Sequence, residues 1–248
     1  MELELARRAL DLARRAEKYA APANSGFLTP AEQAELEAVC ARERLDVALR
    51  GGDGDCERKA AFFLPSWMEA EALDVSEALS AIRITAAFGS PGHRDYLGAI
   101  LGLGVRRDCL GDIRISDNVA HLFCLSTIAD YLLANLEQVG RCGVKAAAIP
   151  LSEVPPPERQ YRSVTFTAQS LRLDTVCGGM FRISRTQAAE QIAQGNVSVN
   201  YVVCFKPDRS VAPGDVVTLR GRGKGTLDAV GGTSRKGRQF VEGELYLS

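Results

Sequence analysis

The pattern of hydrophobic and polar positions divides the chain into three stretches, of which the first covers residues 1–75. It opens with "MELELARRALDLARRAEKYA", in which leucines and alanines recur as on one face of an amphipathic helix. A second helix is predicted over "TPAEQAELEAVCARE", with Thr29 as its N-cap and Pro30 at its first position. The segment "DVALRGGDGDCERKAAFFLP" then predicts two strands joined by a glycine-rich turn. We therefore expect a helical and hairpin region over 1–75.

The second stretch, residues 76–150, alternates strands with helices. Strands are predicted over "SAIRITAAF", "DIRIS", "VAHLFCL" and "VKAAAI". Helices are predicted over "HRDYLGAILGLG" and "STIADYLLANLEQVG", the second with Ser126 as its N-cap. The order β-α-β-β-α-β is that of a ferredoxin-like or RRM-like domain. "VAHLFCL" lacks the aromatic pattern of a standard RRM, so base stacking in the usual RRM manner is not expected. We expect this domain to pack with residues 1–75.

A proline-rich polar segment over residues 151–163 predicts a linker to the third stretch, residues 164–248. There, "SLRLDTVCGG" predicts a short helix with Ser170 as its cap and Gly178 as its stop. The segments "NVSVNYVV" and "VVTLR" alternate as strands do. The whole chain is therefore predicted to be α+β, with a small C-terminal α/β domain.

A second helix of this domain is predicted over "SRTQAAEQIAQG". Ser184 and Gln187 stand three residues apart, which is the spacing of a capping box. Gly195 is expected to end the helix, because glycine adopts the left-handed backbone conformation at little cost.

Composition adds one feature to this picture, an uneven distribution of charge. The chain has 248 residues, a hydrophobic content of 46% and a net charge of −1, all ordinary for a globular protein. Residues 1–169 carry 19 Lys and Arg against 24 Asp and Glu, whereas residues 170–240 carry 11 against 5. A basic C-terminal domain indicates a polyanionic partner, and a merely solvated basic face is the alternative.

Several function classes are excluded by what the sequence lacks. The seven cysteines are scattered and form no Cys-x-x-Cys pair, so we expect reduced buried thiols and no metal site. No apolar run approaches the length of about 18 residues that a membrane span needs, and the N-terminus does not resemble a signal peptide. We expect a cytoplasmic protein without membrane contact, metal or cofactor.

Arginines flank the predicted start of the second C-terminal helix. A helix N-terminus presents unpaired N–H groups and the positive end of the helix dipole. Arg182 and Arg185 lie at that end, and Arg172 lies one helix earlier. Guanidinium groups and amides together suit a phosphate group, so this end is predicted to bind a nucleic-acid backbone. For each arginine alone, a surface salt bridge is the alternative.

The tripeptide "RLD", residues 172–174, has a second interpretation. It resembles the catalytic segment of pseudouridine synthases, in which an aspartate is the nucleophile. Those enzymes carry a large catalytic domain around the motif, whereas only 74 residues follow Asp174 here. An ion pair or a helix-cap contact is therefore the favoured interpretation of Asp174.

Four short motifs follow one another in the third stretch. They are Arg-Leu-Asp, Ser-Arg followed by an alanine pair, Gly-x-Val-x-Val-Asn, and Gly-Asp. This series resembles the S-four RNA-binding domain, first seen in a small-subunit ribosomal protein. Tyr201 stands where many members of that family have glycine.

The resemblance extends beyond that domain. "GGDGDCERKAAFFLP", "GHRDYLGAILGLGVRRDCLGDI", "VGRCGVKAAAIPLSE" and "LRGRGKGTLDAVGGTSRKGR" resemble the bacterial YlmH family, which is related to photosystem II S-four proteins. The resemblance covers about residues 25–248. It implies a non-enzymatic RNA-binding protein of translation that binds rRNA and tRNA on the large ribosomal subunit. It further implies ribosome-associated quality control of stalled peptidyl-tRNA. We expect a monomer.

The resemblance and the charge pattern together give the candidate residues. The predicted RNA-binding residues are Arg172, Arg182, Ser184, Arg185, Gln187, Asn200, Arg220, Arg222 and Lys224. Secondary contacts with RNA or the ribosome are predicted for His93, Arg94, Arg106, Arg107, Arg235, Lys236 and Arg238. No catalytic residue is predicted. An RNA-modifying enzyme or its targeting subunit, and a protein-interaction scaffold, remain as alternatives.

Overall fold

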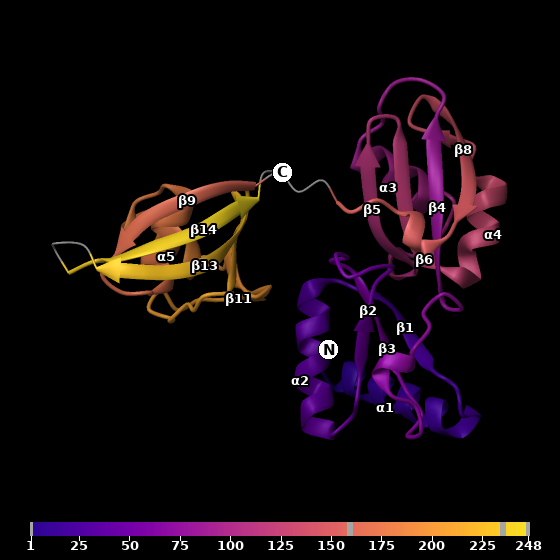
Figure 1. Cartoon of the computed structure of the whole chain (residues 1–248), viewed down its shortest axis with the longest axis horizontal. Helices are drawn as coiled ribbons and strands as arrows, with labels where there is room; N and C mark the ends of the chain where they lie inside the picture. Colours follow the sequence, from indigo (N-terminus) through magenta and orange to yellow (C-terminus); the bar gives the residue numbers. More distant parts are fainter. Residues whose placement is uncertain (1, 158–160, 234–236, 247–248) are drawn as a thin grey trace. The chain divides into compact units, whose positions relative to one another are not determined.

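The computed structural model describes residues 2–157, 161–233 and 237–246. The chain divides into two compact units, Met1–Pro157 and Glu158–Ser248, and each is described by itself (Figure 1). Within the stretch predicted as a linker, Val154 is buried in the first unit and a strand of the second unit begins at Tyr161.

The first unit opens with a layer of two helices and a small sheet (Figure 1). The helices are α1 (Glu2–Tyr19) and α2 (Pro30–Glu43), and the strands are β1 (Ala23–Leu28), β2 (Ala48–Arg50) and β3 (Lys59–Phe63). The strand order is β1-β3-β2, and both pairings are antiparallel. We call this part the N-terminal layer.

Local sequence explains most of this layer. Thr29 caps α2 as predicted, in a capping box with Glu32. The predicted hairpin is present, because β2 pairs with β3. Strand β1 was not predicted, since "ANSGFL" does not alternate cleanly between apolar and polar residues. Its pairing with β3 is irregular between Asn24 and Phe27, which is why the pattern has no regular period.

The rest of the first unit is a five-stranded antiparallel sheet with two helices. Its elements are β4 (Leu79–Ala86), α3 (His93–Gly102), β5 (Leu110–Ser116), β6 (Val119–Leu125), α4 (Ser126–Asn135), β7 (Gln138–Val139) and β8 (Cys142–Ile149). The strand order is β5-β6-β4-β8-β7. The predicted β-α-β-β-α-β order is present, and β7 adds a short strand at one edge.

The two faces of this sheet have different partners. Ile82 and Ile84 on β4 pack with Tyr96 of α3 and Leu132 of α4. The alternate positions of β4 face the other way, where Leu79 packs in a cluster with residues of the N-terminal layer. We call the face without helices the open face.

The fourth helix differs from its prediction at both ends. The N-cap of α4 is Leu125, and the Ser126 hydroxyl lies 2.8 Å from that of Ser80 instead of capping the helix. The helix ends at Asn135, and Gln138–Val139 forms β7 against β8. The predicted cap is therefore wrong, because the Ser126 hydroxyl forms a hydrogen bond with Ser80 of β4 instead.

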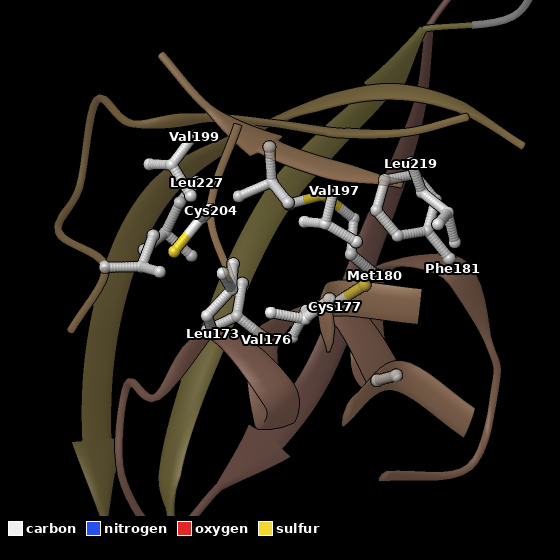
Figure 2. Close-up of a cluster of buried hydrophobic side chains, with 14 of the residues drawn as sticks. Leu173, Val176, Cys177, Met180, Phe181, Val197, Val199, Cys204, Leu219 and Leu227 are labelled. Carbon is white, nitrogen blue, oxygen red and sulfur yellow. The ribbon is translucent and has the colours of Figure 1, made fainter. Parts of the chain in front are cut away.

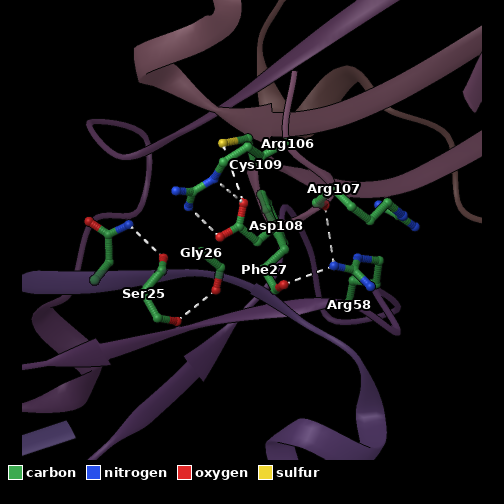
Figure 3. Close-up of polar contacts among 9 residues, drawn as sticks. Ser25, Gly26, Phe27, Arg58, Arg106, Arg107, Asp108 and Cys109 are labelled. Atoms are coloured by element: carbon green, nitrogen blue, oxygen red, sulfur yellow. Dashed lines mark hydrogen bonds and ion pairs between the residues drawn. The ribbon is translucent and has the colours of Figure 1, made fainter. Parts of the chain in front are cut away.

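Backbone carbonyls and one arginine tie the N-terminal layer to the five-stranded sheet (Figure 3). The Arg58 side chain donates to the carbonyl oxygens of Phe27 and Leu110, at 2.8 and 2.9 Å. A Cβ on Gly26 would lie 2.7 Å from the Asp108 carbonyl oxygen, so only glycine allows this close approach. The layer and the sheet are therefore held by polar contacts as well as apolar packing.

An ion pair between the buried Arg114 and the half-buried Asp53 makes a second tie. Arg114 donates to both carboxylate oxygens of Asp53, at 2.6 and 2.7 Å, and to the Pro155 carbonyl oxygen at 2.9 Å. The hydrogen bonds from Arg114 hold the pKa of Asp53 below its ordinary value, against the opposing effect of burial. The glycine-rich turn that contains Asp53 thus docks on the sheet.

The second unit is a six-stranded sheet covered by two short helices. Its elements are β9 (Tyr161–Ala168), α5 (Leu173–Phe181), α6 (Arg185–Ala193), β10 (Val197–Val199), β11 (Val202–Val203), β12 (Val216–Leu219), β13 (Gly223–Thr233) and β14 (Gln239–Tyr246). The strand order is β11-β10-β12-β13-β14-β9. Figure 2 shows its core, in which Val176 and Met180 of α5 face Val197 and Leu219 of the sheet.

The first helix of this unit corrects two predictions. Its N-cap is Arg172, not Ser170, and Gly178 lies inside the helix, which continues to Phe181. Gly178 and its neighbour Gly179 both serve packing, and a Cβ on Gly178 would lie 3.2 Å from the Ile183 carbonyl oxygen. A Cβ on Gly179 would lie 2.3 Å from the Phe166 ring, so a side chain at this position would force the helix off the sheet.

The remaining global expectations concern thiols, membranes and metals. All seven cysteines are free, and five of them are buried. Burial raises the pKa of Cys56, Cys124 and Cys177 to about 12. None of the helices in the described part of the chain is both long and apolar enough to cross a membrane. The described residues include no cluster of His, Cys, Asp or Glu suited to a metal ion.

Candidate nucleic-acid interface

The start of α6 is built by the predicted capping box. The Ser184 hydroxyl accepts from the Gln187 backbone N–H at 3.1 Å, and the Gln187 side chain accepts from the Ser184 backbone N–H at 3.1 Å. Both side chains are exposed. Ser184 and Gln187 therefore fix where the helix begins, and they place its N-terminal turn at the surface.

Asp174 links this helix end to α5. Its carboxylate accepts from the Arg172 and Arg185 guanidinium groups, with Nη2 to Oδ2 distances of 3.1 and 3.0 Å. Asp174 is only 4% exposed. Burial alone would raise its pKa, but the hydrogen bonds from Arg172, Arg185 and Thr175 outweigh burial and lower it. The ion-pair interpretation of Asp174 is confirmed.

This arrangement positions two predicted RNA-binding arginines. The side chains of Arg172 and Arg185 remain 40% and 61% exposed although each donates to Asp174. A guanidinium group has five donors, so both keep N–H groups that face solvent. The two predicted phosphate contacts are thus brought together by a carboxylate buried between the helices.

Arg182 lies in the turn between α5 and α6. It ends α5 with a left-handed backbone, φ 53°, and its side chain is exposed. The described residues show no carboxylate partner for it. Its guanidinium group is therefore open to a phosphate beside the start of α6.

Asn200 has a different position. Its side chain donates to Asp215 at 2.7 Å and accepts from the Val216 backbone N–H at 2.8 Å, which joins the β10–β11 turn to β12. Asn200 and Tyr201 have φ values of 50° and 65°, as in a two-residue type I′ hairpin turn. The nitrogen and the oxygen of the Asn200 side-chain amide thus both have partners within the fold. Tyr201 adopts the left-handed backbone conformation that glycine adopts at least cost.

Arg220 and Arg222 form a second cationic site on the turn between β12 and β13. Both are exposed. The Arg220 backbone N–H donates to the Asn196 carbonyl oxygen at 2.9 Å, which places the turn beside the C-terminal end of α6. Arg182 and Arg185 lie at the other end. Because α6 has nine residues, the two sites are separated by about 13 Å of helix.

Lys224 follows that turn and is held by aromatic rings. Its ammonium nitrogen lies 5.8 Å from the centre of the Tyr201 ring and 5.2 Å from that of Tyr246. Such cation–π contacts fix the cation on the sheet. Lys224 is therefore part of a packed cluster, whereas Arg220 and Arg222 project from a turn.

The structure adds two cations that the sequence did not single out. Lys206 and Arg209 lie in the loop that docks on the start of α5. There, the Leu173 N–H donates to the Arg209 carbonyl oxygen at 2.8 Å, and the Asp174 N–H to that of Pro207 at 3.0 Å. No local motif predicts this contact, because the loop and the helix are about thirty residues apart in sequence.

The predicted secondary contacts of the first unit occupy two separate places. His93 and Arg94 are exposed at the N-terminus of α3, and Arg106 and Arg107 follow its C-terminus. Arg106 is paired with Asp108 (Figure 3). Arg107 donates to the Leu110 carbonyl oxygen at 2.9 Å, and its partial burial lowers its pKa. Arg106 and Arg107 thus each have a partner within the fold.

The last three predicted residues follow β13. Arg235 and Lys236 lie outside the described residues. Arg238 is described and is exposed.

Comparisons with known proteins bear on both units. A family model described as "Putative RNA-binding domain in YlmH" matches residues 71–153, and an S4 domain model matches residues 171–217. The chain is also 34% identical over 215 residues to "Ribosome-associated protein quality control protein P2" of Bacillus subtilis (strain 168). That match covers 87% of this chain and 84% of the relative. The chain belongs to the YlmH family.

A solved structure of the YlmH family has the same fold. It is "Cell division protein ylmH from Streptococcus pneumoniae", with a TM-score of 0.52 and 19% identity, covering 61% of this chain and 93% of that one. The resemblance inferred from the motifs is confirmed, as are the α+β class and the C-terminal S4 domain. The RNA contacts of individual residues stay predictions.

Proposed function

We propose that this YlmH-family chain binds rRNA and tRNA on the large ribosomal subunit and acts there, without catalysis, in quality control of stalled peptidyl-tRNA. The name of the Bacillus subtilis relative, which covers most of the chain, supports association with the ribosome. The two RNA-binding-type domain matches support RNA as the partner. We further propose that it acts as a monomer in the cytoplasm.

The observation that carries the proposal is the pair of cationic sites at the two ends of α6. One combines the exposed Arg182 with the solvent-facing donors of Arg172 and Arg185, and the other is the turn of Arg220 and Arg222. Guanidinium groups bind phosphates through paired N–H donors. Two cationic sites at opposite ends of one short helix suit two points along an RNA backbone, which gives affinity and orientation but no sequence reading.

The proposed absence of catalysis rests on Asp174. A catalytic aspartate must reach its substrate, whereas this carboxylate is buried and accepts hydrogen bonds from two arginines and a threonine. Its geometry serves to orient the arginines. An RNA-modifying enzyme would need some other reactive group, and none of the described contacts in this unit suggests one.

Co-sedimentation with purified large ribosomal subunits tests the proposal. Wild-type protein is compared with a variant carrying Arg182→Ala, Arg220→Ala and Arg222→Ala, with and without bound tRNA, over a salt series. Loss of three contacts of about 1 kcal/mol each predicts binding weaker by about 100-fold. The slope of log affinity against log salt should fall by about 2 to 3.

A charge-matched control carries Arg7→Ala, Arg15→Ala and Arg162→Ala, three exposed positions outside the two sites. It should bind like wild type. The proposal would be contradicted if wild-type protein failed to sediment in every state, or if both triple variants bound equally well.

A further inference from the structure

The register of the five-stranded sheet aligns residues of four strands on the open face. β4 lies between β6 and β8, and β5 pairs with the far side of β6 (Figure 1). One row across this face is Arg114, His121, Arg83 and Ala147, and the next is Ser116, Val119, Thr85 and Lys145. Side chains of one face alternate along each strand, so these eight point away from α3 and α4.

Half of the open face is covered. Leu79, Ala81 and Phe123 pack in one buried cluster with residues of the N-terminal layer and with Val154. Arg114 marks the border, because it is 9% exposed and donates to Asp53 and Pro155. The covered half thus ends at the row of Arg114 and His121.

The other half is exposed and cationic. Arg83, Lys145 and Ala147 are exposed, and Thr85 and Val119 are half-buried. Arg83 lies directly opposite Ala147, so Lys145 is its diagonal neighbour, with about 7–8 Å between their Cα atoms. Neither of the two rows contains a carboxylate.

Nothing in this half of the sheet explains the cations as stabilising groups. Cross-strand pairs stabilise a sheet when their charges are opposite. The cross-strand neighbours of Arg83 are His121 and Ala147, and that of Lys145 is Thr85. Among the described residues, no ion pair joins Arg83 or Lys145 to a carboxylate. Within the described part of the chain, the guanidinium group of Arg83 therefore has no carboxylate partner on the central strand.

His121 adds no positive charge to the two arginines of its row at neutral pH. It lies between Arg83 and Arg114 and is 9% exposed. Burial lowers its pKa, and the nearby charges of Arg83 and Arg114 lower it further. The neutral ring avoids a third positive charge in the row and spaces the two guanidinium groups.

We propose that the exposed half of the open face, centred on Arg83 and Lys145, is a second RNA-binding site that contacts the phosphate backbone. The two cations lie at diagonal positions on neighbouring strands, and the small side chains of Thr85 and Ala147 beside them let a phosphate backbone approach. Neither row presents an exposed aromatic ring, so the site contacts phosphates and does not stack bases. The inference rests on the proposed function, and it places an RNA contact on each unit.

The test uses the full chain, with large ribosomal subunits carrying tRNA as the probe. The variant Arg83→Ala/Lys145→Ala should bind about tenfold more weakly, and its salt slope should fall by about 2. The control Arg7→Ala/Lys18→Ala removes the same charge from exposed positions on α1 and should bind like wild type. Lys145 should also be acetylated by an amine-reactive reagent in free protein and protected in the complex.

The outcomes separate this inference from the function on which it rests. If the double variant binds like wild type and Lys145 stays reactive in the complex, the second site is overturned while the S4 sites stand. If the control weakens binding as much as the double variant does, the loss of charge alone is responsible and the site is again overturned. If wild-type protein binds no subunit in any state, both proposals fail together.

Discussion

Two arginines of the first unit and two of the second have opposite surroundings. In the first unit, Arg58 and Arg114 are turned inward and donate to carbonyl oxygens and to a carboxylate. In the second unit, Arg182 and Arg220 are exposed, and the structure shows no carboxylate partner for them among the described residues. The same residue type therefore joins layers at Arg58 and Arg114 and remains available to an anion at Arg182 and Arg220.

The difference shows that charge along a sequence is a poor measure of available charge. An inward guanidinium group uses its donors to satisfy groups that lose contact with water at the junction. An exposed one keeps its donors for a ligand. Arg172 and Arg185 are intermediate, because a buried aspartate orients them while part of each stays in solvent.

The largest effect is expected where a guanidinium group loses its partner in the interior. Asp53→Ala leaves Arg114 charged and 9% exposed, so we expect a loss of about 3 kcal/mol in the stability of the first unit. Urea unfolding followed by the fluorescence of Trp67, the only tryptophan of the chain, measures it. The double variant Asp53→Ala/Arg114→Met should recover most of the loss. An unchanged urea midpoint for Asp53→Ala would show that the pair does not hold the junction.

A smaller loss is expected at the intermediate pair of arginines. Asp174→Asn removes the buried charge but leaves Arg172 and Arg185 partly hydrated, so we expect a loss of about 2 kcal/mol in the second unit. Amide hydrogen exchange in α5 measures it in the full chain.

The same variant makes a prediction about pH. The pKa of Asp174 is lower in the folded protein than in the unfolded chain. Its stabilisation is therefore complete above the unfolded value of about 3.9 and is lost as the pH falls through the folded value. The difference in the stability of the second unit between wild type and Asp174→Asn should shrink below about pH 4. A difference that is constant with pH would contradict the assignment of the ion pair.

The smallest effect is expected at an exposed pair. Arg106 is 72% exposed and Asp108 is 34% exposed, so Arg106→Ala should leave the free energy of unfolding of the first unit nearly unchanged. The urea midpoint of the first unit measures it. A loss as large as that of Asp53→Ala would remove the distinction between inward and outward arginines.

Local sequence predicted the elements that local contacts determine. Thr29 and Ser184 cap their helices as expected, because a capping box involves residues only three apart. The β-α-β-β-α-β order followed from alternation and periodicity. Strand β1 was missed because its irregular pairing with β3 gives no period, and Gly178 was misjudged because glycine can also serve packing.

The candidate site was predictable in part. The cations at the start of α6 and on the β12–β13 turn were identified from motifs and charge. Their separation by the length of α6 was not, since it depends on how the turn packs beside Asn196. Arg83 and Lys145 carried no motif, and only the register of β4 with β8 makes them neighbours.

The sequence by itself determined the six α-helices of the described residues, part of the strands, the family and the positions along the chain where positive charge collects. The tertiary structure alone decided which of these charges remain available. Partners such as Asp53 for Arg114 lie far apart in sequence, and packing selects them. A guanidinium group is hydrogen-bonded within the fold or left in solvent according to which acceptors the fold places within about 3 Å of it. No local sequence pattern specifies those acceptors.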